Sequence, residues 1–345
     1  MKRLTVIVLT LAMCLSMLAG CGNKKESTAV GNADYDVNEV VVKVGETEIT
    51  MDEYRYYIIQ AAVTELTSRK PDFDGNFDAL DWNEKVDGDK TLSDVIKDRA
   101  IEDIKGTVAM VELGTKNGVS LGDAEKKQLE TMLTQTKEQQ GEEVFKLVLR
   151  QMGMSSEENF KKVYNMTTLY SKVEEDIGAN RDKYIDAELE AKLVAYKNDE
   201  TVTAQHVLIM NESEKHSDPK AAIDEVLQRA KAGEDFNALM TEYNEDPGEG
   251  PGGYTFGKGK MVPEFEAASF ALDYNQISDI VPSSYGYHVI KRIVGMAELK
   301  PYLLETTQVM VNNDAVATVS VGEIMAEVNK ATEEINAQRG GKNNG

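Results

Sequence analysis

Hydrophobic residues recur mainly at helical spacing between residues 38 and 198. One exception is the alternating stretch 40–50, which predicts a β-hairpin with its turn at Gly45-Glu46. Thr50 is placed to cap a helix that begins at Met51. Further helices are predicted over 91–117, 123–139, 142–152, 156–177 and 182–197.

Beyond residue 198 the elements become shorter and mixed. Val202 to Ile209 alternates like a strand, and Asp218-Pro219 begins a helix. The next elements are a helix over 235–243, a strand over 254–256, a helix from Pro263 and strands over 277–281 and 287–294. This order, βααβαββ, predicts a small α+β domain of about 100 residues. The segment 298–345 adds a helix over 322–338 and a disordered tail.

The N-terminus has the pattern of an export signal. Lys2 and Arg3 precede an uncharged stretch over 4–20, which is short for a membrane span and typical of a signal peptide. It ends in Leu18-Ala19-Gly20-Cys21, which resembles the lipobox of bacterial lipoproteins and implies lipidation of Cys21. A plain secretory signal with an incidental cysteine is the alternative. Residues 21–37 are low in bulky apolar side chains and read as a flexible tether.

Composition narrows the function classes. The 345 residues carry 38 Lys+Arg and 60 Asp+Glu, a net charge of −22, which argues against a nucleic-acid partner. The two cysteines are Cys14 and Cys21, so the body of the chain has no internal disulfide and no cysteine nucleophile. No P-loop, dinucleotide fingerprint or G-x-S-x-G elbow occurs in the sequence.

Four stretches of the second region stand out by their order and spacing. They are AQHVL at 204–208, YNED at 243–246, GGYTFG at 252–257 with MVPEF at 261–265, and YGYHVI at 285–290. Together they resemble the parvulin family of peptidyl-prolyl cis–trans isomerases, over residues 199–297. The region 38–198 more loosely resembles the chaperone domain of the SurA and PrsA foldases. The whole arrangement is therefore similar to a PrsA-type foldase lipoprotein.

The resemblance implies a fold and a polar site. The expected class is α+β, with a helical chaperone-like domain over 38–198 and a parvulin-like domain over 199–297. The latter has a four-stranded, mainly antiparallel sheet flanked by helices. In the family, the positions of His206 and His288 form a hydrogen-bonded pair behind the substrate amide. Asp246 falls near this pair, and Ser283 falls where a Ser or Thr orients it.

The resemblance also implies a pocket for the proline ring. Met261 and Phe265 are four residues apart on a predicted helix, so they share one face. Tyr254 or Phe256 supplies the third wall. Where the family has Gly-Gly-Asp-Leu-Gly, this chain has Gly-Gly-Tyr-Thr-Phe at 252–256, which displaces or replaces the leucine wall.

Prolyl isomerisation breaks no covalent bond, so it requires neither nucleophile nor metal, and we expect no cofactor. The X–Pro amide must lose resonance against a barrier of about 18–20 kcal/mol. Alternatives for the same residues are a metal site of two histidines and a carboxylate, and a Ser-His-Asp hydrolase. Ordinary core packing would also account for Met261 and Phe265, and a structural role for the histidines.

The expected function is that of a membrane-anchored, extracytoplasmic bacterial foldase. It would isomerise X–Pro bonds in unfolded secreted proteins, with holdase activity in its helical region. An inactive parvulin scaffold that only binds clients is the alternative, and a solute-binding lipoprotein is a third reading. The long helical stretch speaks against the last of these. The sequence leaves open whether 298–345 packs on the N-terminal region and whether the chain forms a homodimer.

Overall fold

A computed structural model describes residues 35–70, 72–73 and 75–340. The chain forms two compact units, each assembled from separate segments. The first contains the described chain up to Glu112, Ser120–Tyr170 and the segment from Thr307 onward, and the second contains Leu113–Val119 and Ser171–Thr306. Cys21 and the predicted tether up to residue 34 lie outside the described residues, as does the tail after residue 340.

A small sheet joins the beginning of the described chain to its end. β1 (Val40–Val44) pairs antiparallel with β2 (Thr47–Thr50), which confirms the predicted hairpin. The other edge of β1 pairs with β9 (Val309–Val311). The C-terminal segment therefore folds back onto the N-terminal region.

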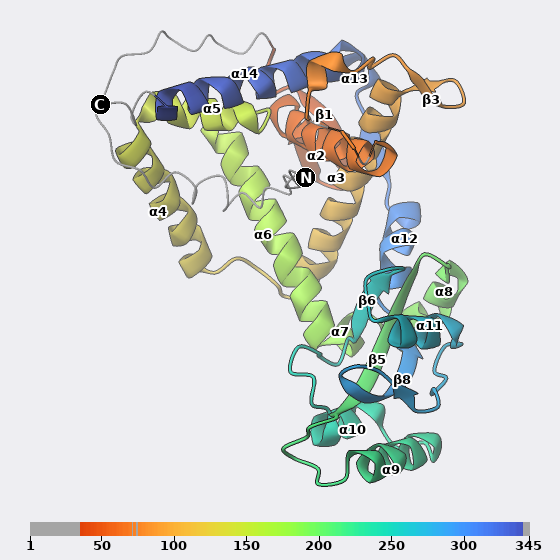
Figure 1. Cartoon of the computed structure of the whole chain (residues 1–345). Coiled ribbons are helices and arrows are strands. Elements are labelled where there is room, and N and C mark those ends of the chain that lie inside the picture. The colour runs from red at the N-terminus through yellow and green to blue at the C-terminus, as the bar shows by residue number, and fades with distance from the viewer. Residues whose placement is uncertain (1–34, 71, 74, 341–345) are drawn as a thin grey trace. The chain divides into compact units, whose positions relative to one another are not determined.

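Helices make up most of the first unit. Thr50 caps α2 (Met51–Arg69) in a capping box, as its position before Met51 predicts. Figure 1 shows α14 (Val321–Gly340) alongside α5 (Glu142–Gln151). Tyr54 and Ile324 are buried in the shared apolar core. The other elements of the unit are η1 (Phe77–Ala79), β3 (Lys85–Asp87), β4 (Lys90–Thr91), α4 (Asp123–Gln140) and α13 (Asn313–Thr318), with α3 (Leu92–Lys116) and α6 (Glu157–Ala179) ending in the second unit.

The second unit is built on a four-stranded sheet in the order β6-β5-β8-β7, with antiparallel pairing throughout. Its strands are β5 (Thr201–Met210), β6 (Tyr254–Gly257), β7 (Val281–Pro282) and β8 (Gly286–Ile293). Its sheet-packing helices are α9 (Pro219–Lys231), α10 (Phe236–Tyr243), α11 (Pro263–Ala271) and α12 (Met296–Thr306). The predicted α+β class and the order βααβαββ are confirmed.

The two faces of this sheet carry different side chains, because successive residues of a strand point to opposite sides. Val207, Ile209 and Val289 pack with residues of α9 and α10. Ala204 and Ile290 face the opposite way, where they pack with Phe256 of β6 and Phe265 of α11. His206 and His288 share the parity of this second pair, so they lie on the α11 face.

Two sequence predictions are wrong in this unit. The helix expected over 182–197 is broken into α7 (Arg181–Tyr184), α8 (Ala187–Leu193) and η2 (Val194–Tyr196). The break occurs because the Asp186 side chain accepts from Leu189 N at 2.8 Å and starts a new helix.

The strand expected over 277–281 reduces to one bridge, Ile277 with Lys291, and to β7. The Ser278 hydroxyl accepts from Ile290 N at 2.9 Å, in the place of a strand carbonyl.

Candidate active site

The register of β5 and β8 brings the two predicted histidines together. Leu208 pairs with His288, and His206 pairs with Ile290, so the two histidines are diagonal neighbours on one face. Their ring centroids are 5.3 Å apart, with 50° between the ring planes. Only 3% of His206 and 4% of His288 is exposed. The two central strands of the sheet, β5 and β8, therefore hold a buried pair of histidine rings side by side.

Helix α11 presents an aromatic ring to both histidines. Pro263 at the first turn sets the start of this helix, and Phe265 follows two residues later. The Phe265 ring meets His206 and His288 edge to face, with centroid distances of 5.1 and 5.4 Å. Phe256 lies 5.7 Å from Phe265, and the partly buried Met261 packs in the same cluster. Phe265 therefore borders the histidine pair, and Phe256 and Met261 pack in the apolar cluster around it.

Ser283 lies on the far side of His288. Its Oγ is 2.7 Å from Nε2 of His288, and it accepts a hydrogen bond from Tyr285 N at 3.1 Å. Its backbone N donates to Gly286 O at 2.8 Å, which closes the turn between β7 and β8. This turn sets the position of the hydroxyl.

Asp246 and Tyr254 lie on the other side, next to His206. Asp246 Oδ2 is 3.6 Å from His206 Nε2, and it accepts a hydrogen bond from the Tyr254 hydroxyl at 3.3 Å. The Tyr254 ring stacks on His206 at 6.0 Å between centroids, with 28° between planes. All eight predicted site residues thus fall in one cluster, with Tyr254 contacting the polar end.

The sequence interpretation missed Glu249. Its carboxylate has no exposed surface, and Oε2 lies 2.9 Å from His206 Nδ1. Oε1 accepts from the backbone N of His206 at 2.9 Å, and Oε2 accepts from Asn244 Nδ2 at 3.0 Å. The available signal was an acidic residue between two glycines, three positions after Asp246, in a loop that otherwise reads as a turn.

Burial dominates the electrostatics of this cluster. Burial and the neighbouring His206 lower the pKa of His288 to about 4, while Asp246 opposes them, so the His288 ring is neutral at pH 7. Burial and the Asp246 charge raise the pKa of the Tyr254 hydroxyl to about 12. Burial also raises the pKa of Glu249, against the lowering contributions of His206 and Asn244. Nδ1 of His288 and both ring nitrogens of His206 are buried and make no hydrogen bond among the described residues, although the Glu249 carboxylate lies 2.9 Å from His206 Nδ1.

The comparisons with known proteins identify this unit. Residues 190–293 match the family model of the PPIC-type PPIase domain. This is a parvulin-type peptidyl-prolyl isomerase domain. The protein is accordingly a peptidyl-prolyl cis–trans isomerase of the parvulin type, and the family predicted from the four motifs is confirmed.

Relatives extend the likeness beyond the isomerase domain. The foldase protein PrsA of Caldanaerobacter subterraneus is 28% identical over 295 residues, which cover 84% of this chain and 82% of that protein. The foldase protein PrsA 4 of Bacillus cereus is 29% identical, covering 66% and 70%. PrsA of Halalkalibacterium halodurans is 43% identical over 93 residues, or 26% of this chain and 25% of that one. The likeness to PrsA foldases therefore extends over most of this chain, beyond its isomerase domain.

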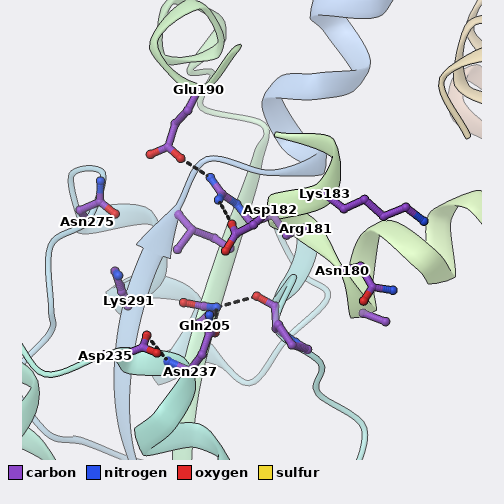
Figure 2. A pocket seen from close by; sticks show the side chains of 13 residues that line it. Asn180, Arg181, Asp182, Lys183, Glu190, Gln205, Asp235, Asn237, Asn275 and Lys291 are labelled. Carbon is purple, nitrogen blue, oxygen red and sulfur yellow. Dashed lines mark hydrogen bonds and ion pairs between the residues drawn. The ribbon is translucent and has the colours of Figure 1, made fainter. Parts of the chain in front are cut away.

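A separate cavity of about 430 Å³ lies beside the isomerase sheet (Figure 2). Its lining is polar, and its charged groups largely pair with one another: Arg181 contacts Asp182 at 2.7 Å and Glu190 at 2.6 Å. Gln205 of β5 and Lys291 of β8 line it, and both have the strand parity of the α9 and α10 face. None of the eight predicted site residues lines this cavity, so it is distinct from the histidine cluster.

The histidine cluster offers groups for binding and orientation. Within the described part of the chain, no group of three His, Cys, Asp or Glu residues is arranged to hold a metal ion. The helices in that part include none long and apolar enough to span a membrane. What the cluster combines is an aromatic and thioether surface with a neutral imidazole, a hydroxyl and carboxylates. Such groups can grip an apolar ring and orient an adjacent amide.

Proposed function

We propose that the His206–His288 face of the sheet is where the isomerase domain acts on X–Pro bonds. The observation that carries this proposal is the contact of one aromatic ring, Phe265, with both buried histidines. An apolar surface and a polar network then meet at one place. Isomerisation needs both, because the proline ring must be held while the amide carbonyl swings out of the plane of conjugation.

In this proposal the proline ring packs against Met261, Phe265 and Phe256. The adjacent amide then lies beside His206, His288 and their hydrogen-bond partners. In the twisted transition state, the amide nitrogen becomes pyramidal and the carbonyl regains double-bond character. Polar groups that fit this geometry better than either planar form lower the barrier, and buried groups do so with little reorganisation. The Ser283 hydroxyl holds the His288 ring, and Asp246 lies 3.6 Å from the His206 ring. No proton need leave the substrate, because isomerisation breaks no covalent bond.

We further propose that the protein works as a foldase on the outer side of a bacterial cell membrane. Support comes from the basic residues, apolar stretch and Leu18-Ala19-Gly20-Cys21 of the N-terminus, and from relatives named foldase protein PrsA. Lipid on Cys21 would anchor the chain, with residues 21–37 as a tether. The net charge of −22 would keep the folded part away from an anionic lipid surface.

The clients in this proposal are unfolded secreted polypeptides that contain proline. We assign their holding to the helical region 38–198, together with the C-terminal segment that packs on it. The loop 211–218 has no basic cluster, because Lys215 is its one Lys or Arg and stands among acidic residues, so a phosphate-directed specificity is not expected. Unphosphorylated X–Pro segments remain as the substrates.

Refolding of a protein that is limited by a prolyl bond tests the site. The purified protein should accelerate this refolding, and His288→Ala and Met261→Ala should each reduce the acceleration. Undiminished acceleration in both variants would place the site elsewhere in the domain. No acceleration by the folded wild type would leave a client-binding chaperone on an inactive scaffold.

Anchoring is tested separately by Cys21→Ser in a bacterial host. Fractionation should move the protein from the membrane to the soluble extracytoplasmic fraction, and labelled fatty acid should no longer be incorporated. Equal membrane recovery and labelling of the variant would contradict lipidation at Cys21.

A further inference from the structure

We propose that Glu249 is the positioning residue of the isomerase site, and that its buried carboxylate fixes the His206 ring with the proton on Nδ1. The inference rests on the site proposed above, because it takes His206 as part of that site. Glu249 itself is not proposed to touch the substrate. It acts through the histidine that does.

The contacts of Glu249 lock one residue at two points. Oε1 accepts from the backbone N of His206, and Oε2 faces Nδ1 of the same residue, each at 2.9 Å. Because backbone and ring are held by one rigid carboxylate, the side chain of His206 cannot rotate without losing one of these contacts. The ring nitrogen on the other side, Nε2, is 3.6 Å from Asp246, beyond hydrogen-bond distance. We therefore assign the proton to Nδ1, the ring nitrogen that faces the carboxylate at 2.9 Å.

The surrounding donors require a carboxylate rather than an amide at this position. Asn244 donates to Glu249 Oε2 from Nδ2, and it cannot turn over, because its Oδ1 accepts from Leu208 N at 2.9 Å and from Asp246 N at 3.2 Å. Both oxygens of Glu249 therefore face fixed N–H donors. A glutamine would place its own NH₂ against one of them in either orientation.

The loop that carries Glu249 is itself fastened. Gly252 N donates to Gly178 O at 2.6 Å, at the end of α6, and Gln205 Nε2 donates to Pro251 O at 2.6 Å. Gln205 is the neighbour of His206 on β5 and points into the cavity of Figure 2. Gln205 of β5 thus holds the loop, and Glu249 of the loop in turn contacts His206 of the same strand. Positioning of this kind is effective only from a rigid element.

The decisive experiment reads the ring proton directly in the full-length protein. The chain has three histidines, His206, His216 and His288, so ¹⁵N spectra of the ring nitrogens are assignable with one His→Gln variant each. Wild type should show His206 protonated at Nδ1 and not at Nε2. In Glu249→Gln, the amide oxygen can keep the hydrogen bond from the backbone N of His206, which turns the NH₂ group toward Nδ1, so the ring proton should move to Nε2.

A matched control separates positioning from loss of a buried charge. Glu298 also has no exposed side-chain surface and accepts from Gly295 N at 2.9 Å, but it pairs with Arg292 at 3.9 Å and not with His206. Glu298→Gln should leave the His206 spectrum unchanged and kcat/KM within about twofold of wild type. Glu249→Gln should lower kcat/KM about tenfold or more, since a displaced positioned group can cost up to about 10²-fold. Both are measured below the onset of unfolding.

Several outcomes would overturn the proposal. One is a wild-type His206 protonated at Nε2, which decides the matter even if Glu249→Gln fails to fold. Another is a Glu249→Gln variant with an unchanged ring spectrum, or with kcat/KM equal to that of Glu298→Gln. Failure of the proposed function looks different: the wild type would lack isomerase activity, or His206→Ala would retain it, while the ring spectrum would still report on Glu249.

Discussion

Phe265 meets His206 edge to face, with 5.1 Å between the ring centroids. The same ring is 5.4 Å from His288, so one side chain of α11 closes over both histidines. This relationship depends on long-range packing, since α11 lies more than 50 residues after His206 in the chain. It also offers a direct test of which aromatic residue of α11 serves the site.

Phe265→Leu and Phe270→Leu make the same chemical change on one helix. Phe270 contacts Phe256 at 6.1 Å instead of the histidines, although it belongs to the same apolar cluster. Both variants should lose stability, by about 1 kcal/mol for a partial loss of buried volume. Only Phe265→Leu should also lose most of its isomerase activity, measured as kcat/KM on an X–Pro peptide. Equal activities of the two variants at equal folded fraction would contradict the proposed site.

Neutrality of His288 predicts how stability depends on pH. Its pKa is about 4 in the folded protein, against about 6.5 when unfolded, so the unfolded chain binds more protons between these values. The free energy of unfolding should therefore fall as pH drops from about 6.5 to about 4, by at most about 3 kcal/mol from this group. Above pH 6.5 this contribution is constant.

Urea unfolding of wild type and His288→Gln over this pH range measures the effect. The difference between the two curves is the relevant quantity. The raised pKa of Glu249 increases the free energy of unfolding as pH falls, and because it does so in both proteins, the difference removes its contribution. The stability of His288→Gln relative to wild type should increase as pH falls. A difference that is flat from pH 4 to 7 would show that the His288 pKa is not lowered.

Ser283 should matter through its hydroxyl. The 2.7 Å contact with His288 Nε2 is a hydrogen bond that alanine cannot make and threonine can. Ser283→Ala should cost about 1 kcal/mol of stability and lower isomerase activity several-fold, because a buried ring nitrogen loses its partner. Ser283→Thr should retain most of both. If Ser283→Thr loses as much stability and activity as Ser283→Ala, retaining the hydroxyl is not sufficient, and the orienting role of Ser283 is contradicted.

Local chemistry made much of the fold predictable from the sequence. Thr50 before Met51 and Asp218 before Pro219 are caps whose effect acts within one turn, and both helices begin where expected. The strand that carries His206 was predicted from the alternation of apolar and polar residues over 202–209. The break at Asp186 was missed because the polar segment 182–197 contains no Gly or Pro that would mark a helix end, and the cap at Asp186 starts a new helix within it.

The candidate site was only partly predictable for a different reason. The motifs placed His206, His288, Met261 and Phe265 through their resemblance to a family. Glu249 has no counterpart in those motifs and lies in a run of glycines and prolines, so nothing local indicated that its carboxylate would be buried. The pairing of β9 with β1 was equally invisible, because strand pairing across more than 260 residues leaves no local pattern.

Gly253 lies where the loop that carries Glu249 enters β6, and its conformation suits glycine alone. Its φ is +66°, and a Cβ would stand 2.5 Å from the carbonyl oxygen of Ala204. Gly253→Ala should therefore lose stability for two reasons: about 1 kcal/mol from the positive φ, and more from the clash with β5.

Gly259 provides the control, because its φ is +76° and nothing lies within 4 Å of its Cβ position. Gly259→Ala should show the first cost only and keep its isomerase activity. Gly253→Ala should also lose activity, since shifting this loop displaces Glu249 from His206. Thermal unfolding and kcat/KM of the two variants measure both effects, and equal losses would mean that the close approach to Ala204 has no bearing on the site.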